Sequence, residues 1–145
     1  MTNRQQVPLG VIEIDIPSRT DLVTVVRMIV ASAASAAEAL GGDRMDDLRW
    51  VTSEATTNAI EANLKCDRPG RVRTRCEIGS DWVRLLVVDE GPGMPELSDL
   101  PEIDHPERLL MEGGFGVPLM QHLSSGEVSF HSGPSSTTVE LELHQ

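Results

Sequence analysis

Glu54 and Asn58 are two residues whose types and spacing could do chemistry together. They are four positions apart, so in a helix they share a face and lie beside its apolar stripe. A carboxylate and a carboxamide offer oxygen atoms to a hard cation such as Mg²⁺, and the carboxylate could instead accept a proton or orient a hydroxyl group. The alternative is an ordinary polar border of a helix, because acidic and amide residues are common on helix surfaces.

A second candidate segment begins at Asp89, where a run of apolar residues ends. A carboxylate at the end of a buried strand is a good acceptor for the exocyclic amine of a base. Gly91 and Gly93 would let the backbone approach a flat ligand without interference from a Cβ atom. The alternative is a tight turn after a strand, because this DxGxG spacing is easily matched by chance.

A third candidate segment contains Gly113, Gly114 and Gly116. Glycine-rich backbone before a helix presents free N–H groups and the positive end of the helix dipole to an anion, as phosphate-binding loops do. The spacing matches neither the Walker A pattern, since no Lys-Ser/Thr follows, nor the dinucleotide-binding GxGxxG pattern. A hinge or a helix cap is the alternative.

The elements that must position these segments begin with a strand and a helix. Residues 11–16 alternate apolar and polar side chains, which is the period of a half-buried strand. Ser18 and Asp21 form a capping signal, and apolar residues then recur at helical spacing as far as Leu40. We therefore expect a first helix over residues 20–40, closed by the glycines at 41–42.

A second helix is predicted to carry Glu54 and Asn58. Asp43 can cap its beginning, and the Arg-Pro-Gly sequence at residues 68–70 would end it. Its apolar stripe is formed by Leu48, Val51, Ala55, Ala59 and Ala62.

The second half of the chain is predicted to be mostly strand and loop. Residues 90–116 contain too many glycines and prolines for a long regular element. The expected elements are strands at 72–78, 82–89, 128–130 and 138–143, a short helix at 117–123, and turns at 79–81 and 133–136. Together they predict an α+β domain in which helices cover one face of an antiparallel or mixed sheet.

Composition excludes several classes of protein. The 145 residues suit a single domain, and the formal net charge of −11 with 3% aromatic residues opposes direct binding of nucleic acid. The charge suits a basic partner or a carboxylate site for a cation. No apolar stretch reaches the ~18 residues of a membrane span, so we expect a cytoplasmic protein. Cys66 and Cys76 are expected to be reduced, with a local disulfide as the alternative. The four histidines are scattered and predict no metal site.

The three segments together resemble the motifs of the GHKL ATPase superfamily. The N box corresponds to Glu54-x-x-x-Asn58-Ala59, the G1 box to Asp89-x-Gly91-x-Gly93 and the G2 box to Gly114-x-Gly116. Thr137 lies in a segment similar to the family's Gly-Thr-x-Val sequence, with Ser136 where glycine is usual. The resemblance covers residues 45–143 and implies one histidine-kinase-like ATPase domain over residues 1–145, with the two-layer Bergerat α/β sandwich and a mixed sheet covered on one face by helices.

Within the superfamily, the chain most resembles the small anti-sigma-factor serine kinases of bacteria. The resemblance implies that Asn58 binds Mg²⁺, that Glu54 acts as general base or orients the attacking hydroxyl, and that Asp89 contacts the adenine of ATP. It assigns the other nucleotide contacts to Gly91 and Gly93 beside the base, to Gly113, Gly114 and Gly116 in a phosphate lid, and to Thr137, whose hydroxyl supports the adenine contact.

The function implied is that of an ATP-dependent protein serine/threonine kinase and anti-sigma factor. Such a protein binds a sigma factor, phosphorylates a small anti-anti-sigma protein and forms a homodimer. One alternative is a partner-switching module that binds nucleotide without transferring phosphate, because Ala62 stands where many relatives have His and Ser136 replaces a glycine. The detached catalytic domain of a histidine kinase is a weaker alternative, since no helical hairpin with a phospho-acceptor His precedes the N box.

Overall fold

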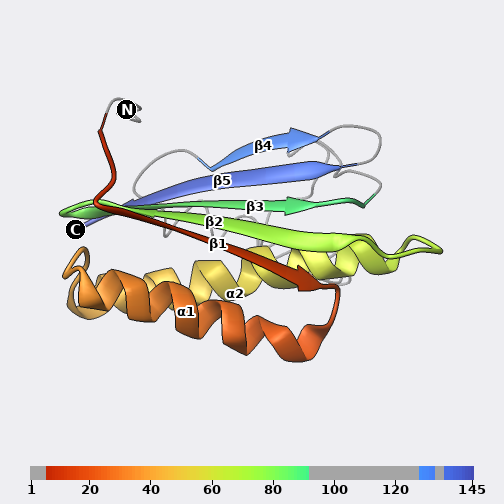
Figure 1. Ribbon diagram of the computed structural model, residues 1–145, viewed down its shortest axis with the longest axis horizontal. Helices are drawn as coiled ribbons and strands as arrows, with labels where there is room; N and C mark the ends of the chain where they lie inside the picture. The colour runs from red at the N-terminus through yellow and green to blue at the C-terminus, as the bar shows by residue number, and fades with distance from the viewer. Residues whose placement is uncertain (1–5, 92–127, 133–135) are drawn as a thin grey trace, which may run out of the picture.

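The computed structural model describes residues 6–91, 128–132 and 136–145, which form a two-layer α+β arrangement (Figure 1). The predicted strands are all confirmed to within two residues at each end, whereas the predicted helix at 117–123 and most of the turn at 133–136 lie outside the described residues. The elements are β1 (Gly10–Pro17), the 3-10 helix η1 (Thr20–Leu22), α1 (Val23–Ala36), α2 (Gly42–Leu64), β2 (Arg71–Ile78), β3 (Trp82–Asp89), β4 (Ser129–Ser132) and β5 (Thr137–His144).

The sheet has the strand order β1-β2-β3-β5-β4, and each of these neighbouring pairs is antiparallel. Of the two predicted alternatives, an antiparallel or a mixed sheet, the described strands form the antiparallel one, so the mixed sheet is corrected for this part of the chain. Two helices, α1 and α2, lie between β1 and β2 in the chain, and together they return it to the end of the sheet at which β1 finished (Figure 1). A single crossover helix would have made β1 and β2 parallel.

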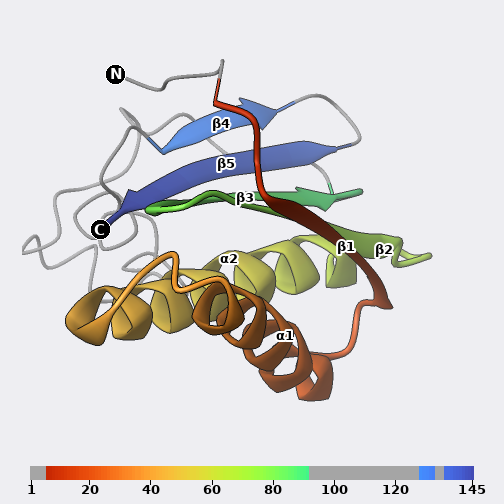
Figure 2. The ribbon, with the colours of Figure 1, turned by 60° about the vertical axis from the view of Figure 1, so that its left-hand side comes forward.

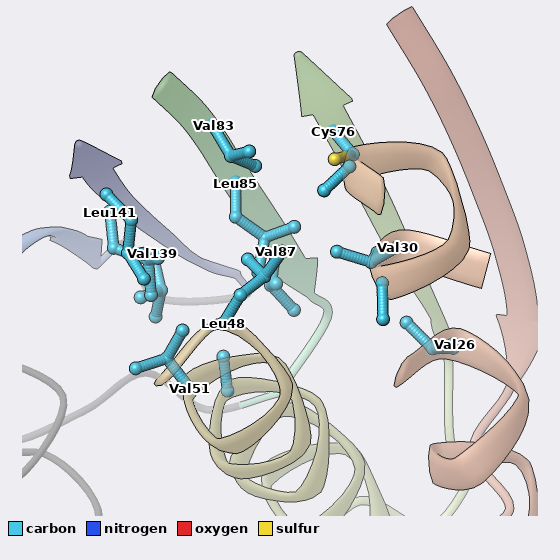
Figure 3. Close-up of a cluster of buried hydrophobic side chains, with 14 of the residues drawn as sticks. Val26, Val30, Leu48, Val51, Cys76, Val83, Leu85, Val87, Val139 and Leu141 are labelled. Atoms are coloured by element: carbon cyan, nitrogen blue, oxygen red, sulfur yellow. The ribbon is translucent and has the colours of Figure 1, made fainter. Parts of the chain in front are cut away.

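Both helices cover the same face of the sheet, as predicted (Figures 1 and 2). Successive strand residues point to opposite faces, so alternate residues of the central strand β3 meet the helices. Figure 3 shows the resulting core, in which Val83, Leu85 and Val87 of β3 lie among side chains from α1, α2 and β5. This core holds α2, which carries Glu54 and Asn58, against the face of β3 that the helices cover. Among the described residues, no helix is both long and apolar enough to cross a membrane.

The first helix ends earlier than predicted. α1 stops at Ala36, and Glu38 takes a left-handed conformation with φ of 53°. The Ala39 N–H then donates to the Ala34 carbonyl at 3.0 Å and the Glu38 N–H to the Ser35 carbonyl at 3.0 Å, which is the Schellman pattern of a helix end. The early end of the helix directs Ala39 and Leu40 into the core. The free energy gained by burying them outweighs the cost of a non-glycine residue, Glu38, in the left-handed conformation.

The second helix is confirmed, although its ends differ from the prediction. Its N-cap is Gly41, and Asp43 lies in the first turn rather than at the cap. It ends at Leu64, before the Arg-Pro-Gly sequence at residues 68–70. The expected stripe is buried as far as Ala59, and it includes the fully buried Ile60, which the prediction missed. Both cysteines are free thiols, as expected.

Candidate functional site

Glu54 and Asn58 lie where the helical spacing predicted, at the border between the core and solvent. Both side chains are half-buried, whereas Ala55 and Ala59, which follow each of them directly, are buried in the core. Ala62 is four residues beyond Asn58 and is also half-buried. Residues 54, 58 and 62 therefore form one row along α2, which we call the α2 row.

Partial burial gives Glu54 an altered acidity. Desolvation is the main cause that raises the pKa of its carboxyl above the ordinary value of 4.5, and the negative charge of Glu61 raises it further. Glu61 is seven residues along the same helix, so the two carboxylates lie on a common side of α2. A carboxylate with a raised pKa is a better proton acceptor than an ordinary surface glutamate, which is the property that a general base requires.

Asp89 is the last residue of β3 and is almost completely buried. It lies opposite Thr137 of β5, which has no exposed surface. Burial raises the pKa of the Asp89 carboxyl, and the backbone N–H groups of Gly91 and Thr137 partly oppose that rise by donating to it. The Gly91 N–H lies 2.8 Å from Asp89 Oδ1. The structure thus pairs Asp89 with Thr137, two residues that the sequence placed 48 positions apart.

The turn after Asp89 packs directly on the end of the α2 row. A Cβ atom added to Gly91 would lie 2.8 Å from the carbonyl carbon, the carbonyl oxygen and the Cβ of Ala62. Because two of these atoms are helix backbone, no side-chain movement could relieve the contact. Gly91 is therefore required for the close approach of the turn to α2, and this approach sets the turn after Asp89 against Ala62, the last member of the α2 row.

Sequence reasoning missed Asn63, a fully buried residue in the last turn of α2. Its Oδ1 accepts the backbone N–H of Glu90 at 2.7 Å. Its Nδ2 donates to Ser18 Oγ at 2.9 Å and to the Arg71 carbonyl at 3.2 Å. One signal could have revealed it: Asn63 follows Ala59 by four residues, so a carboxamide falls in the apolar stripe, where a buried polar group needs partners.

Four predicted site residues belong to the part of the chain outside the described ranges. Gly93, Gly113, Gly114 and Gly116 lie outside the described residues. Of the predicted set, the structure therefore locates Glu54, Asn58, Asp89, Gly91 and Thr137.

The α2 row offers oxygen ligands from two side chains only, Glu54 and Asn58. This suits Mg²⁺ better than it suits a metal ion whose ligands all come from the protein. Within the described ranges, no group of three or more acidic, histidine or cysteine side chains could hold a metal ion. Mg²⁺ usually takes only one or two oxygen ligands from protein and completes its shell with phosphate oxygens and water. Asn58, a half-buried residue four positions from Glu54, fits that limited role.

Two hollows of about 500 and 520 Å³ lie elsewhere, along α1. None of the predicted site residues lines either of them, so they are separate from the α2 row and the Asp89 turn. The first is lined by Arg27, Met28, Ala31, Ser32, Ser35, Ala36 and Arg49, and the second by Ile12, Met28, Ile29, Ser32 and Ala33.

Comparison with known proteins gives matches that span the site. Residues 16–143 match the histidine kinase-like ATPase domain family. The chain is 32% identical over 128 residues to the serine-protein kinase RsbW of Bacillus subtilis, a match that covers 84% of this chain and 79% of that protein. It is 30% identical over 106 residues to the anti-sigma F factor of Bacillus licheniformis, covering 70% of each chain.

Two solved structures share the fold. The RsbU and RsbW domains of a Mycobacterium tuberculosis protein match with a TM-score of 0.67 and 19% identity, covering 94% of this chain and 32% of that one. The SiaB–SiaC complex of Pseudomonas aeruginosa matches with a TM-score of 0.66 and 14% identity, covering 96% of this chain and 91% of that one.

Proposed function

The chain belongs to the histidine kinase-like ATPase domain family, and we propose that it is an ATP-dependent protein serine/threonine kinase that also acts as an anti-sigma factor. The observation that carries the proposal is the contact between Gly91 and Ala62, which sets the turn after the buried Asp89 against the same row of α2 that carries Glu54 and Asn58. Relatives named serine-protein kinase and anti-sigma factor support it.

Asp89 supplies the adenine contact in this proposal. Its carboxylate accepts the exocyclic amine of adenine, and burial strengthens that hydrogen bond because little water competes for it. The backbone N–H of Gly91 holds one carboxylate oxygen in place. Thr137, which faces Asp89 across the strands, supports the same contact through its hydroxyl, and Gly91 borders the base.

The α2 row supplies the groups for phosphoryl transfer. Bound with Mg²⁺, ATP would provide the transferable phosphoryl group, and the ion would neutralise the phosphate charge. Asn58 would hold the ion through its amide oxygen. Glu54 accepts the proton of the attacking serine or threonine hydroxyl, a role to which its raised pKa is suited. By the family resemblance, Gly93 would border the base, and Gly113, Gly114 and Gly116 would contribute backbone N–H groups to the phosphates.

The partners proposed are a sigma factor and a small anti-anti-sigma protein that receives the phosphoryl group. A homodimer, a cytoplasmic location and a single domain over the whole chain are part of the same proposal. The second candidate function is a nucleotide-binding switch without transfer, which Ala62 favours because many relatives have His there. The intact Glu54 favours the kinase, since a binding module has no need of a proton acceptor at that point.

Transfer of phosphate to the antagonist tests the kinase directly. The full chain would be incubated with Mg²⁺, labelled ATP and the anti-anti-sigma protein encoded nearest to its gene, and the modified residue would be located by mass spectrometry. We expect phosphoserine or phosphothreonine with the wild-type chain, and a rate about 10²–10⁴ lower for Glu54→Gln. Unchanged ADP affinity in that variant is the control. Nucleotide binding without any transfer would favour the switch.

A further inference from the structure

Asn63 joins three segments of the chain that are distant in sequence. It contacts Ser18 after β1, Arg71 at the start of β2 and Glu90 after β3. The network extends one step further, because Ser18 Oγ donates to the Gly70 carbonyl at 2.6 Å. A residue with no exposed surface thus links the end of α2 to the turn that carries Asp89.

The chemistry of these partners requires a carboxamide. The Glu90 N–H can only donate and the Arg71 carbonyl can only accept, so Asn63 must present oxygen to the first and nitrogen to the second. Aspartate would keep the acceptor but lose both donors. An apolar residue would leave the Glu90 N–H without this partner in a part-buried place, which is costly.

The hydrogen bond to Glu90 acts on the peptide unit that directly follows Asp89. Gly91, the residue after Glu90, adds two further contacts. Its N–H donates to the Asp89 carboxylate, and its Cα packs on Ala62. The turn is therefore fixed to α2 at two adjacent points, Ala62 and Asn63. Asn58 and Glu54 lie five and nine residues earlier on the same rigid helix.

We propose that Asn63 is a positioning residue of the nucleotide site, one that holds Asp89 in register with the α2 row through the backbone of Glu90. The proposal rests on the proposed function, in which Asp89 recognises adenine. Asn63 itself touches no nucleotide. Its loss lets the turn move, so the site loses the ability to tell a base with an amine at this position from one with a carbonyl.

The side chain of Glu90 makes contacts of its own, apart from the hydrogen bond between its backbone N–H and Asn63. Its Oε1 accepts from Arg73 NH2 at 2.9 Å, and its carboxylate packs against Gly70. Only the backbone N–H of Glu90 reaches Asn63. Ser18, by contrast, shares the Asn63 network on the side remote from Asp89, so Ser18→Ala is a matched control that disturbs the same network without releasing the turn.

The test compares the affinities of the full chain for ADP and GDP by calorimetry in the presence of Mg²⁺. Adenine donates an amine where guanine presents a carbonyl, which an aspartate repels. Partial unfolding weakens both affinities by the same factor, so their ratio reports positioning and not stability. We expect Asn63→Ala to lower the preference for ADP by about tenfold, and Asn63→Asp and Ser18→Ala to keep it within about twofold.

Asn63→Leu, which fills a similar volume, takes the place of the alanine variant if that protein does not fold, and the same loss of preference is expected. An ADP preference that is unchanged in Asn63→Ala or Asn63→Leu overturns the proposal and leaves Asn63 a purely structural residue. Failure of the wild-type chain to bind ADP is a different result, because it contradicts the proposed function itself.

Discussion

Gly91 and Ala62 are in such close contact that a single methyl group on Gly91 would meet the backbone of α2 at 2.8 Å. Gly91→Ala is therefore expected to push the Asp89 turn away from the helix. We expect a loss of about 1–3 kcal/mol in the free energy of unfolding and a weakening of ADP binding, measured by denaturant titration and calorimetry. Ala62→Gly should not rescue the variant, because the carbonyl carbon and oxygen of residue 62 remain. Gly10→Ala is the harmless control, because a Cβ atom added there would meet no atom within 4 Å beyond the adjoining residues.

The pH dependence of phosphoryl transfer should report the acidity of Glu54. Transfer needs the ionised carboxylate, so the rate should fall as the pH falls through a pKa that lies above 4.5. Glu61→Gln removes one of the two causes that raise the pKa of Glu54. The pH–rate profile of this variant should therefore shift to lower pH, with little change in the maximal rate reached at higher pH. A profile that does not move would mean that a group other than Glu54 controls the acid limb.

The same raised pKa predicts an effect on stability. The folded state of a group with a raised pKa holds its proton more tightly than the unfolded state, so the stability it contributes is present below pH 4.5 and is lost as the pH rises through the folded pKa. Glu54→Gln should therefore raise the Tm at pH 7, by about 1–3 °C for a half-buried group. The gain should shrink towards pH 4, and scanning calorimetry at both pH values would measure it. An equal gain at the two pH values would point to a cause other than titration.

Glu38, with its φ of 53°, offers a prediction about the fold alone. A side chain in the left-handed region costs free energy that glycine does not, so Glu38→Gly should stabilise the protein by about 0.5–1 kcal/mol. Ala36→Gly, two residues earlier and still helical, should destabilise it by about 1 kcal/mol. Chemical denaturation of both variants compares the signs, and a loss of stability in Glu38→Gly would show that its side chain makes a favourable contact.

Much of the fold could be predicted because each strand and the α2 stripe carry a local pattern. The alternation in β1 and the apolar run that ends at Asp89 need no knowledge of the rest of the chain. The pairing of Glu54 with Asn58 follows from helical spacing alone. The end of α1 could not be predicted in this way, because burial of Ala39 and Leu40 outweighs the local preference for a glycine at a helix end.

The contacts that hold the candidate site together could not be predicted from local sequence patterns. Asn63 forms hydrogen bonds with Ser18, 45 positions before it, and with Glu90, 27 positions after it. No pattern within a single segment of the sequence indicates that these residues are in contact. The contact between Gly91 and Ala62 is of the same kind, since the DxGxG spacing indicates a tight turn but not the helix against which it packs. Residue types identified the groups that do chemistry, whereas the residues that hold them together became visible only in three dimensions.

The central claim is that Asp89 recognises the adenine of a nucleotide bound beside the α2 row. Isothermal titration of ADP with Mg²⁺ into the wild-type chain, Asp89→Asn and Glu90→Gln tests it most directly. The two variants remove one negative charge from adjacent residues, one buried and one exposed. We expect Asp89→Asn to weaken binding by tenfold or more, about 1.4 kcal/mol, and Glu90→Gln to bind like the wild type. Equal affinity in all three proteins would contradict the claim.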